Sequence, residues 1–120
     1  MTNSLRDRVL KAAADAGANV EPMECDPDLA DTAVFCEHYD IPLERSANTI
    51  VLASKRPPGV FGVFIVLANT RLDVNGAARR IMGVKKVSFA PAETTAEVTG
   101  MVMGGVTPFG LPDDLSIYVD

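Results

Sequence analysis

Apolar and polar residues recur at helical spacing in the first part of the chain. From Leu5 to Ala13 the apolar positions are three or four residues apart, which places them on one face of a helix. Ser4 precedes this segment as a residue suited to capping a helix, and Gly17 follows it as a residue that can adopt the left-handed conformation. The pattern predicts an amphipathic helix over residues 5–17.

Two segments in the middle of the chain show the pattern of β-strands. Residues 48–54 (NTIVLAS) and 60–70 (VFGVFIVLANT) are rich in β-branched and aromatic side chains. Between them, KRPPG at residues 55–59 has the composition of a turn. Because the second segment is almost continuously apolar, we expect it to be buried on both faces at the centre of a sheet.

Shorter patterns predict the remaining elements. Residues 18–24 suit a short edge strand, because Pro22 lacks the N–H that a central strand needs. Asp73 or Asn75 is expected to cap a helix in the second half of the chain. Strands mixed with helices on this scale predict an α/β fold, a single domain with a mixed β-sheet flanked by helices. The further helices are expected at residues 32–40, 73–83 and 91–100, and the further strands at residues 84–90 and 115–119.

The length and composition of the chain limit the class of protein. With 120 residues, of which 48% are apolar, the chain is long enough for one domain with a hydrophobic core and too short for two. No apolar run approaches the roughly 20 residues that cross a bilayer, and the N-terminal stretch is charged where a signal peptide has its apolar centre. We therefore expect a soluble cytoplasmic protein in which residues 1–120 form a single domain.

Cysteine and histidine are too few for a familiar metal site. Cys25 and Cys36 are 11 residues apart, and His38 is the single histidine of the chain. We expect two reduced thiols, no metal and no cofactor. For His38, two interpretations stay open: a surface imidazole on a helix, or a catalytic base whose partner lies elsewhere in the sequence.

Charge is distributed unevenly along the chain, whose formal net charge is −5. Residues 21–44 contain eight acidic residues and no basic one, whereas residues 55–86 contain seven basic residues and one acidic one. A basic face would suit a nucleic acid, because Lys and Arg beside phosphates supply the affinity. The alternative is that these charges are scattered over the surface and only solvated.

The stretch MVMGGVTPFGLP at residues 101–112 is unlike any other segment of the chain. Glycines permit unusual backbone conformations and prolines stiffen the chain, so such a loop can present its remaining N–H groups to an anion. The alternative interpretation is a tight connection between two elements. The residues by themselves show no catalytic triad, phosphate loop or dinucleotide-binding fingerprint.

The order of three segments resembles the YbaK family, the aminoacyl-tRNA deacylases related to prolyl-tRNA editing domains. These segments are FCEHYDIPLERSANTIVLASK, then TRLDVNGAARRIMGVKKV after the buried strand, then TGMVMGGVTPFGLP, and the similarity runs from about Val20 to Asp120. Its most specific pieces are the G-x-x-x-P pattern from Gly104 to Pro108 and an RS-x-x-T segment at the start of a strand. The latter comprises Arg45, Ser46 and Thr49.

The resemblance implies a fold, a reaction and a set of site residues. The fold is YbaK-like and partly barrel-like, and the reaction is hydrolysis of a mischarged aminoacyl-tRNA, acting in trans on the ester at the tRNA 3′ end. Water is the nucleophile, and the substrate's own ribose hydroxyl replaces a protein base. Catalytic positions are Asn48, Gly104, Gly105, Thr107 and Pro108, and Ser46 and Thr49 bind the substrate. From the basic segment, we expect Arg79, Arg80, Lys85 and Lys86 to contact the tRNA backbone.

Two departures from the family pattern lead to further expectations. Family deacylases carry a lysine where this chain has Asn48, which can donate hydrogen bonds but has no charge. Family chains also continue past the position of Asp120 into another strand segment, so we expect an exposed sheet edge and a homodimer. The expected partners are the aminoacyl-tRNA 3′ end and an aminoacyl-tRNA synthetase. The alternatives at this point are a non-catalytic module that binds the tRNA 3′ end, and an unrelated small structural domain.

Overall fold

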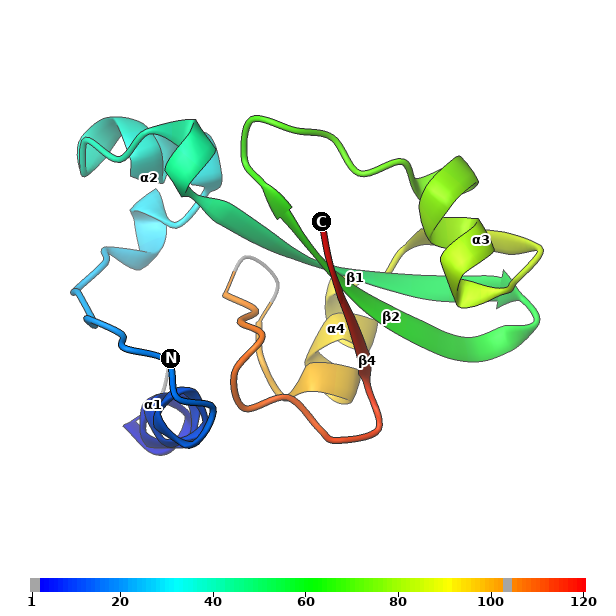
Figure 1. Ribbon diagram of the computed structural model, residues 1–120, viewed down its shortest axis with the longest axis horizontal. Helices are drawn as coiled ribbons and strands as arrows, with labels where there is room; N and C mark the ends of the chain where they lie inside the picture. Colours follow the sequence, from blue (N-terminus) through cyan, green and yellow to red (C-terminus); the bar gives the residue numbers. More distant parts are fainter. Residues whose placement is uncertain (1–2, 103–104) are drawn as a thin grey trace.

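A four-stranded mixed sheet forms the centre of the protein, as Figure 1 shows. The computed structural model describes residues 3–102 and 105–120. The strands lie in the order β3-β1-β2-β4; β1 is antiparallel to both β2 and β3, and β4 runs parallel to β2. The mixed sheet flanked by helices confirms the fold class expected from the sequence. Strand bounds are Ala47–Arg56 for β1, Pro58–Leu67 for β2, Lys86–Phe89 for β3 and Ser116–Val119 for β4.

Helices and short turns connect and cover the strands. No helix among residues 3–102 and 105–120 is apolar over a length that could cross a membrane. The helices are α1 (Asn3–Asp15), α2 (Thr32–His38), α3 (Arg79–Met82) and α4 (Ala92–Thr99). Two 3-10 turns, Pro27–Leu29 and Leu43–Arg45, flank α2, and a π-helical turn, Val74–Ala78, leads into α3.

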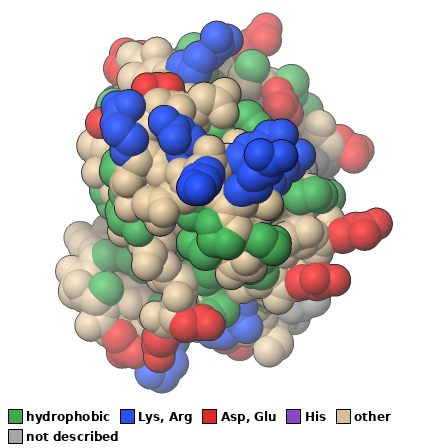
Figure 2. All heavy atoms as spheres, turned by 90° about the vertical axis from the view of Figure 1, so that its right-hand side faces the viewer, with side chains coloured by type: hydrophobic (Ala, Val, Ile, Leu, Met, Phe, Trp, Pro, Cys, Tyr) green, Lys and Arg blue, Asp and Glu red, His purple; other side chains and the backbone are tan. Residues whose placement is uncertain are grey.

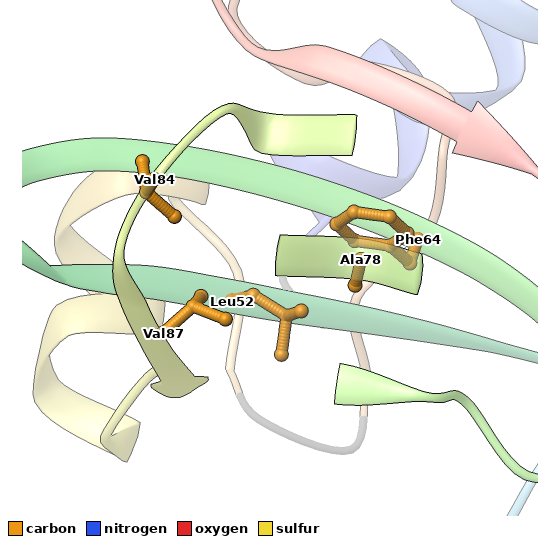
Figure 3. Close-up of a cluster of buried hydrophobic side chains, with 5 residues drawn as sticks. All are labelled: Leu52, Phe64, Ala78, Val84 and Val87. Atoms are coloured by element: carbon orange, nitrogen blue, oxygen red, sulfur yellow. The ribbon is translucent and has the colours of Figure 1, made fainter. Parts of the chain in front are cut away.

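The sheet is buried on both faces around the middle of β2. Val63 and Phe64 are consecutive and therefore point to opposite faces, yet they are only 0% and 3% exposed. This confirms the expected burial of the strand. One face carries the cluster in Figure 3, formed by Leu52, Phe64, Ala78, Val84 and Val87, and the other carries Val51, Val63 and Ala90.

The edge strand expected at residues 18–24 is wrong. This segment forms no regular element, and Val20 and Met23 are 43% and 54% exposed. A strand needs a neighbour to pair with, and the sheet edges are formed by β3 and β4. The turn expected at residues 55–59 is shorter than predicted, because Lys55 and Pro58 pair within the β1–β2 hairpin.

The helix expected at residues 73–83 is divided into the π-helical turn and α3. Asp73, rather than Asn75, caps it: the Asp73 carboxylate accepts hydrogen bonds from the N–H groups of Gly76 at 3.0 Å and Ala77 at 3.1 Å. A side chain at Gly76 would collide with this carboxylate. The sequence pattern therefore located the helical segment and included Asp73 among two candidate caps, but it did not predict the wider first turn.

Candidate functional site

A cavity of about 490 Å³ opens where the start of β1 meets α2 and residues 105–106 of the glycine-rich loop, the stretch at residues 101–112. Figure 1 shows α2 and this end of β1 on the left of the molecule. The five consecutive residues 46–50 form one wall of the cavity. The other lining residues are Cys25, Ala30, Asp31, Thr32 and Phe35, and the loop contributes Gly105 and Val106.

Asn48 is held in the cavity wall by a hydrogen bond from α2. The Thr32 hydroxyl donates to Oδ1 of Asn48 over 2.7 Å, and both side chains are half-buried. Because this bond occupies the oxygen of the amide, the Nδ2 group remains as a donor, and it has no hydrogen-bond partner among the described residues. The cavity wall thus contains a neutral amide donor that Thr32 orients.

The loop offers fewer free amides than its composition suggested. The Gly105 N–H donates to the Val102 carbonyl at 2.9 Å, and the Thr107 N–H lies 3.5 Å from the sulfur of Met101. By contrast, the N–H of Val106 has no partner among residues 3–102 and 105–120. Val106, which sequence analysis did not single out, is therefore the loop residue whose backbone N–H is available beside the cavity.

Thr107 and Pro108 do not line this cavity. The Thr107 hydroxyl accepts a hydrogen bond from the Phe109 N–H at 3.0 Å, which closes a small turn inside the loop. The predicted role of Gly104 falls on a residue outside the described part of the chain. Ser46, Thr49 and Gly105 do line the cavity together with Asn48, although they come from segments more than 50 residues apart.

The four basic residues expected to contact the tRNA backbone lie far from this cavity. Arg79 and Arg80 are on α3, and Lys85 and Lys86 lie at the start of β3, beside the β1–β2 hairpin end. From Asn48 to the hairpin end, β1 advances eight residues, or about 25 Å at the usual rise of a strand. They therefore form no part of the cavity wall.

The structure also separates the interpretations of histidine and cysteine. His38 is exposed at the end of α2, its ring 4.8 Å from the Tyr39 ring, and it does not line the cavity, which favours the surface interpretation. Cys36 is buried, whereas Cys25 is exposed at the cavity. Among the described residues, no group of three or more His, Cys, Asp or Glu side chains could hold a metal ion.

Sequence reasoning missed the contribution of α2 to the site. Thr32 and Asp31 are recognisable as residues at a helix start, and Phe35 as one of its inward positions. The structure shows that the Asp31 side chain makes no capping hydrogen bond and lines the cavity instead. Their local pattern indicated a helix, but it contained no signal that this helix faces Asn48.

Comparison with known proteins identifies the family. The family model described as the aminoacyl-tRNA editing domain matches residues 26–120, most of the chain. The chain belongs to this family. The match includes every residue of the cavity wall except Cys25.

Solved structures resemble the editing domain over almost its whole length. A "putative trans-editing enzyme for prolyl tRNA synthetase" is 25% identical, with a TM-score of 0.79, and the match covers 100% of this chain and 73% of that protein. A "hypothetical protein APE2540" has the same TM-score of 0.79 at 21% identity, covering 94% of this chain and 73% of that protein. The second likeness concerns the fold alone.

Proposed function

We propose that this editing domain hydrolyses, in trans, the ester that joins a mischarged amino acid to the 3′ end of tRNA. The observation that carries the proposal is the Asn48 amide, which Thr32 orients inside a cavity of about 490 Å³. This volume lies within the range of about 300–1,000 Å³ that is common for small-molecule sites. An amino acid esterified to a terminal ribose is a ligand of suitable size.

The available groups suit the charge that develops during ester hydrolysis. Water adds to the carbonyl carbon, the bond from that carbon to the ribose oxygen breaks, and a proton from water passes to the ribose oxygen. Negative charge develops on the carbonyl oxygen, where fixed N–H donors stabilise it without reorganising. We assign this role to Nδ2 of Asn48 and to the N–H of Val106.

Asp31 provides a complementary charge at the same cavity. An aminoacyl ester carries an α-ammonium group, and the Asp31 carboxylate has no hydrogen-bond partner among the described residues. Because opposite charges at close range attract, we assign the ammonium group to Asp31 and the carbonyl oxygen to Asn48. The proposal needs no metal or cofactor.

We also propose the partners, the compartment and the oligomeric state of the domain. Its partners are aminoacyl-tRNA and an aminoacyl-tRNA synthetase, and its compartment is the cytoplasm, where tRNA is charged. A homodimer remains a prediction from the exposed edge strand β4, on which Ile117 and Val119 are 41% and 72% exposed. Light scattering during size exclusion would measure the oligomeric state.

A non-catalytic binding module is the second candidate function. The observation that favours it is the composition of the cavity wall, which contains no lysine or arginine among its described residues. Deacylation assays across a panel of tRNAs, each charged with a different amino acid, distinguish the candidates. An enzyme accelerates the release of at least one amino acid above the uncatalysed rate, whereas a binding module protects the ester or leaves its lifetime unchanged.

Asn48→Lys is expected to raise the deacylation rate about tenfold, because a charge-assisted donor is stronger by roughly 1.4 kcal/mol than a neutral one. The measurement is single-turnover hydrolysis of the tRNA on which the unmodified domain is most active. Thr49→Lys adds the same charge at a neighbouring position of the wall and controls for general attraction of RNA. Equal acceleration by both variants would contradict a specific role of position 48.

Thr32→Val is expected to slow deacylation about tenfold, because it removes the hydroxyl that orients the Asn48 amide and leaves that amide free to rotate. The shape of the side chain is preserved, so binding of tRNA should change much less than the rate of hydrolysis. Thr70→Val is the matched control: its hydroxyl donates to the Leu67 carbonyl at 2.7 Å, outside the cavity. Loss of activity in both variants would indicate that the substitutions destabilise the protein, rather than that Thr32 orients the Asn48 amide.

A further inference from the structure

Six basic side chains gather at the end of the β1–β2 hairpin, on the opposite side of the molecule from the cavity. Figure 2 shows Lys and Arg side chains grouped on the upper half of this face. Two of them, Lys55 and Arg56, lie on β1 next to the turn and were not assigned to any site by sequence analysis. We refer to Lys55, Arg56, Arg79, Arg80, Lys85 and Lys86 as the hairpin-end cluster.

Backbone pairing brings Arg56, Lys85 and Lys86 together. Arg56 and Lys86 are direct partners between β1 and β3, and the Lys85 N–H donates to the Arg56 carbonyl at 2.8 Å. The buried Ser54 hydroxyl contacts the carbonyls of both Pro57 and Lys86, which ties the hairpin turn to β3. The positions of these three basic residues are therefore fixed by the backbone of the sheet end.

The charges of the cluster are not neutralised by the protein. None of the six side chains forms an ion pair among residues 3–102 and 105–120, where the ion pair present joins Lys11 to Asp15 on α1. All are exposed except Arg79, which is half-buried and donates from Nε to the Asn75 carbonyl at 2.9 Å. Like charges directly opposite each other in a sheet are unfavourable, as at Arg56 and Lys86. Such an arrangement on a protein of net charge −5 suits an anionic partner.

We propose that the hairpin-end cluster binds phosphates of the base-paired acceptor stem of tRNA. This inference rests on the proposed function, because it uses the cavity as the position of the 3′ end. The cavity and the cluster are about 25 Å apart along β1. A strand of B-form DNA advances about 3.4 Å per nucleotide, and a strand of A-form RNA advances less. The cluster then lies at least about seven nucleotides from the ester, beyond the single-stranded end.

The test measures binding by fluorescence anisotropy with uncharged tRNA and with a four-nucleotide RNA of the same 3′ sequence. Lys85→Gln/Lys86→Gln is expected to weaken binding of tRNA about tenfold or more at low salt. It should also lower the slope of log Kd against the logarithm of the salt concentration by about two. The four-nucleotide RNA should bind both proteins equally, because it is too short to reach the cluster. Arg6→Gln/Lys11→Gln on α1 removes the same charge elsewhere and should change neither measurement.

Other outcomes overturn the assignment. If both double variants weaken tRNA binding equally, net charge rather than the cluster is responsible. If the variants of Lys85 and Lys86 weaken binding of the short RNA as much as binding of tRNA, the cluster does not contact the stem. If a poly-glutamate peptide of equal charge competes as well as tRNA, the partner is an acidic protein segment. Lys55→Gln on β1, next to the hairpin turn, repeats the test at a position outside β3.

Failure of this inference can be distinguished from failure of the proposed function. Anisotropy with uncharged tRNA needs no hydrolysis. If the protein deacylates no substrate but binds tRNA through the cluster, the stem contact is supported and the proposed deacylase activity is contradicted. If the protein hydrolyses the ester but the cluster variants do not change tRNA binding, the deacylase activity is supported and the stem contact is contradicted.

Discussion

Asn48→Asp is expected to lower the rate of deacylation by about 100-fold to 1,000-fold, the usual effect of losing a donor to a developing oxyanion. The substitution preserves the shape of the side chain, and the Thr32 hydroxyl can still donate to a carboxylate oxygen. What changes is the group facing the substrate, because two N–H donors are replaced by a negatively charged acceptor. Single-turnover hydrolysis of a mischarged tRNA measures the effect.

Asn69→Asp is the matched control for this change. Asn69 lies on an exposed turn after β2 and does not line the cavity, so the variant has the same net charge without altering the site. We expect its rate to stay close to that of the unmodified protein. An Asn48→Asp protein that is folded and fully active would contradict the assignment of Asn48 to the reaction.

Leu52→Ala is expected to lower the free energy of unfolding by about 2–5 kcal/mol, the usual range for a leucine truncated in a core. Leu52 is 0% exposed and packs against Phe64, Ala78, Val84 and Val87 (Figure 3). A large part of the stability of a single domain, which is commonly about 5–15 kcal/mol, then depends on this side chain. Urea denaturation followed by circular dichroism measures the change.

Leu67→Ala makes the same chemical deletion at the end of β2, where the side chain is 45% exposed. Its expected effect is below about 1 kcal/mol, because little apolar surface returns to water. Equal destabilisation by the two variants would show that the face carrying Leu52 is not the main core.

β1 links the two proposed sites. It contributes Asn48 and Thr49 to the cavity at its start and Lys55 and Arg56 to the hairpin-end cluster at its end. Because β1 pairs on both sides, with β2 and β3, the separation of about 25 Å is held by a sheet and not by a loop. A fixed spacing of this kind suits a ligand that is itself stiff, such as a base-paired stem.

The sequence by itself determined the features that depend on near neighbours. The β-branched and aromatic composition predicted β1, and the almost continuous apolar run predicted the buried β2. Asp73 and Asn75 were the two candidates for the start of the helical segment, because a cap acts within about one turn. The G-x-x-x-P pattern and the RS-x-x-T segment pointed to the editing family, which the match over residues 26–120 shows. Segment 18–24 was predicted wrongly, since a pattern cannot tell whether a strand will find a partner.

Only the tertiary structure decided how distant residues combine. Thr32 and Asn48 are 16 residues apart, and their hydrogen bond exists because α2 folds against the start of β1. The Gly105 amide is occupied by Val102, while the Val106 amide is not, and this depends on the path of the loop rather than on its glycines. The sequence contained no measure of the distance between the basic residues and Asn48. Sheet pairing places Lys86 beside Arg56 at the far end of β1, because contacts between strands are set by register and not by order in the chain.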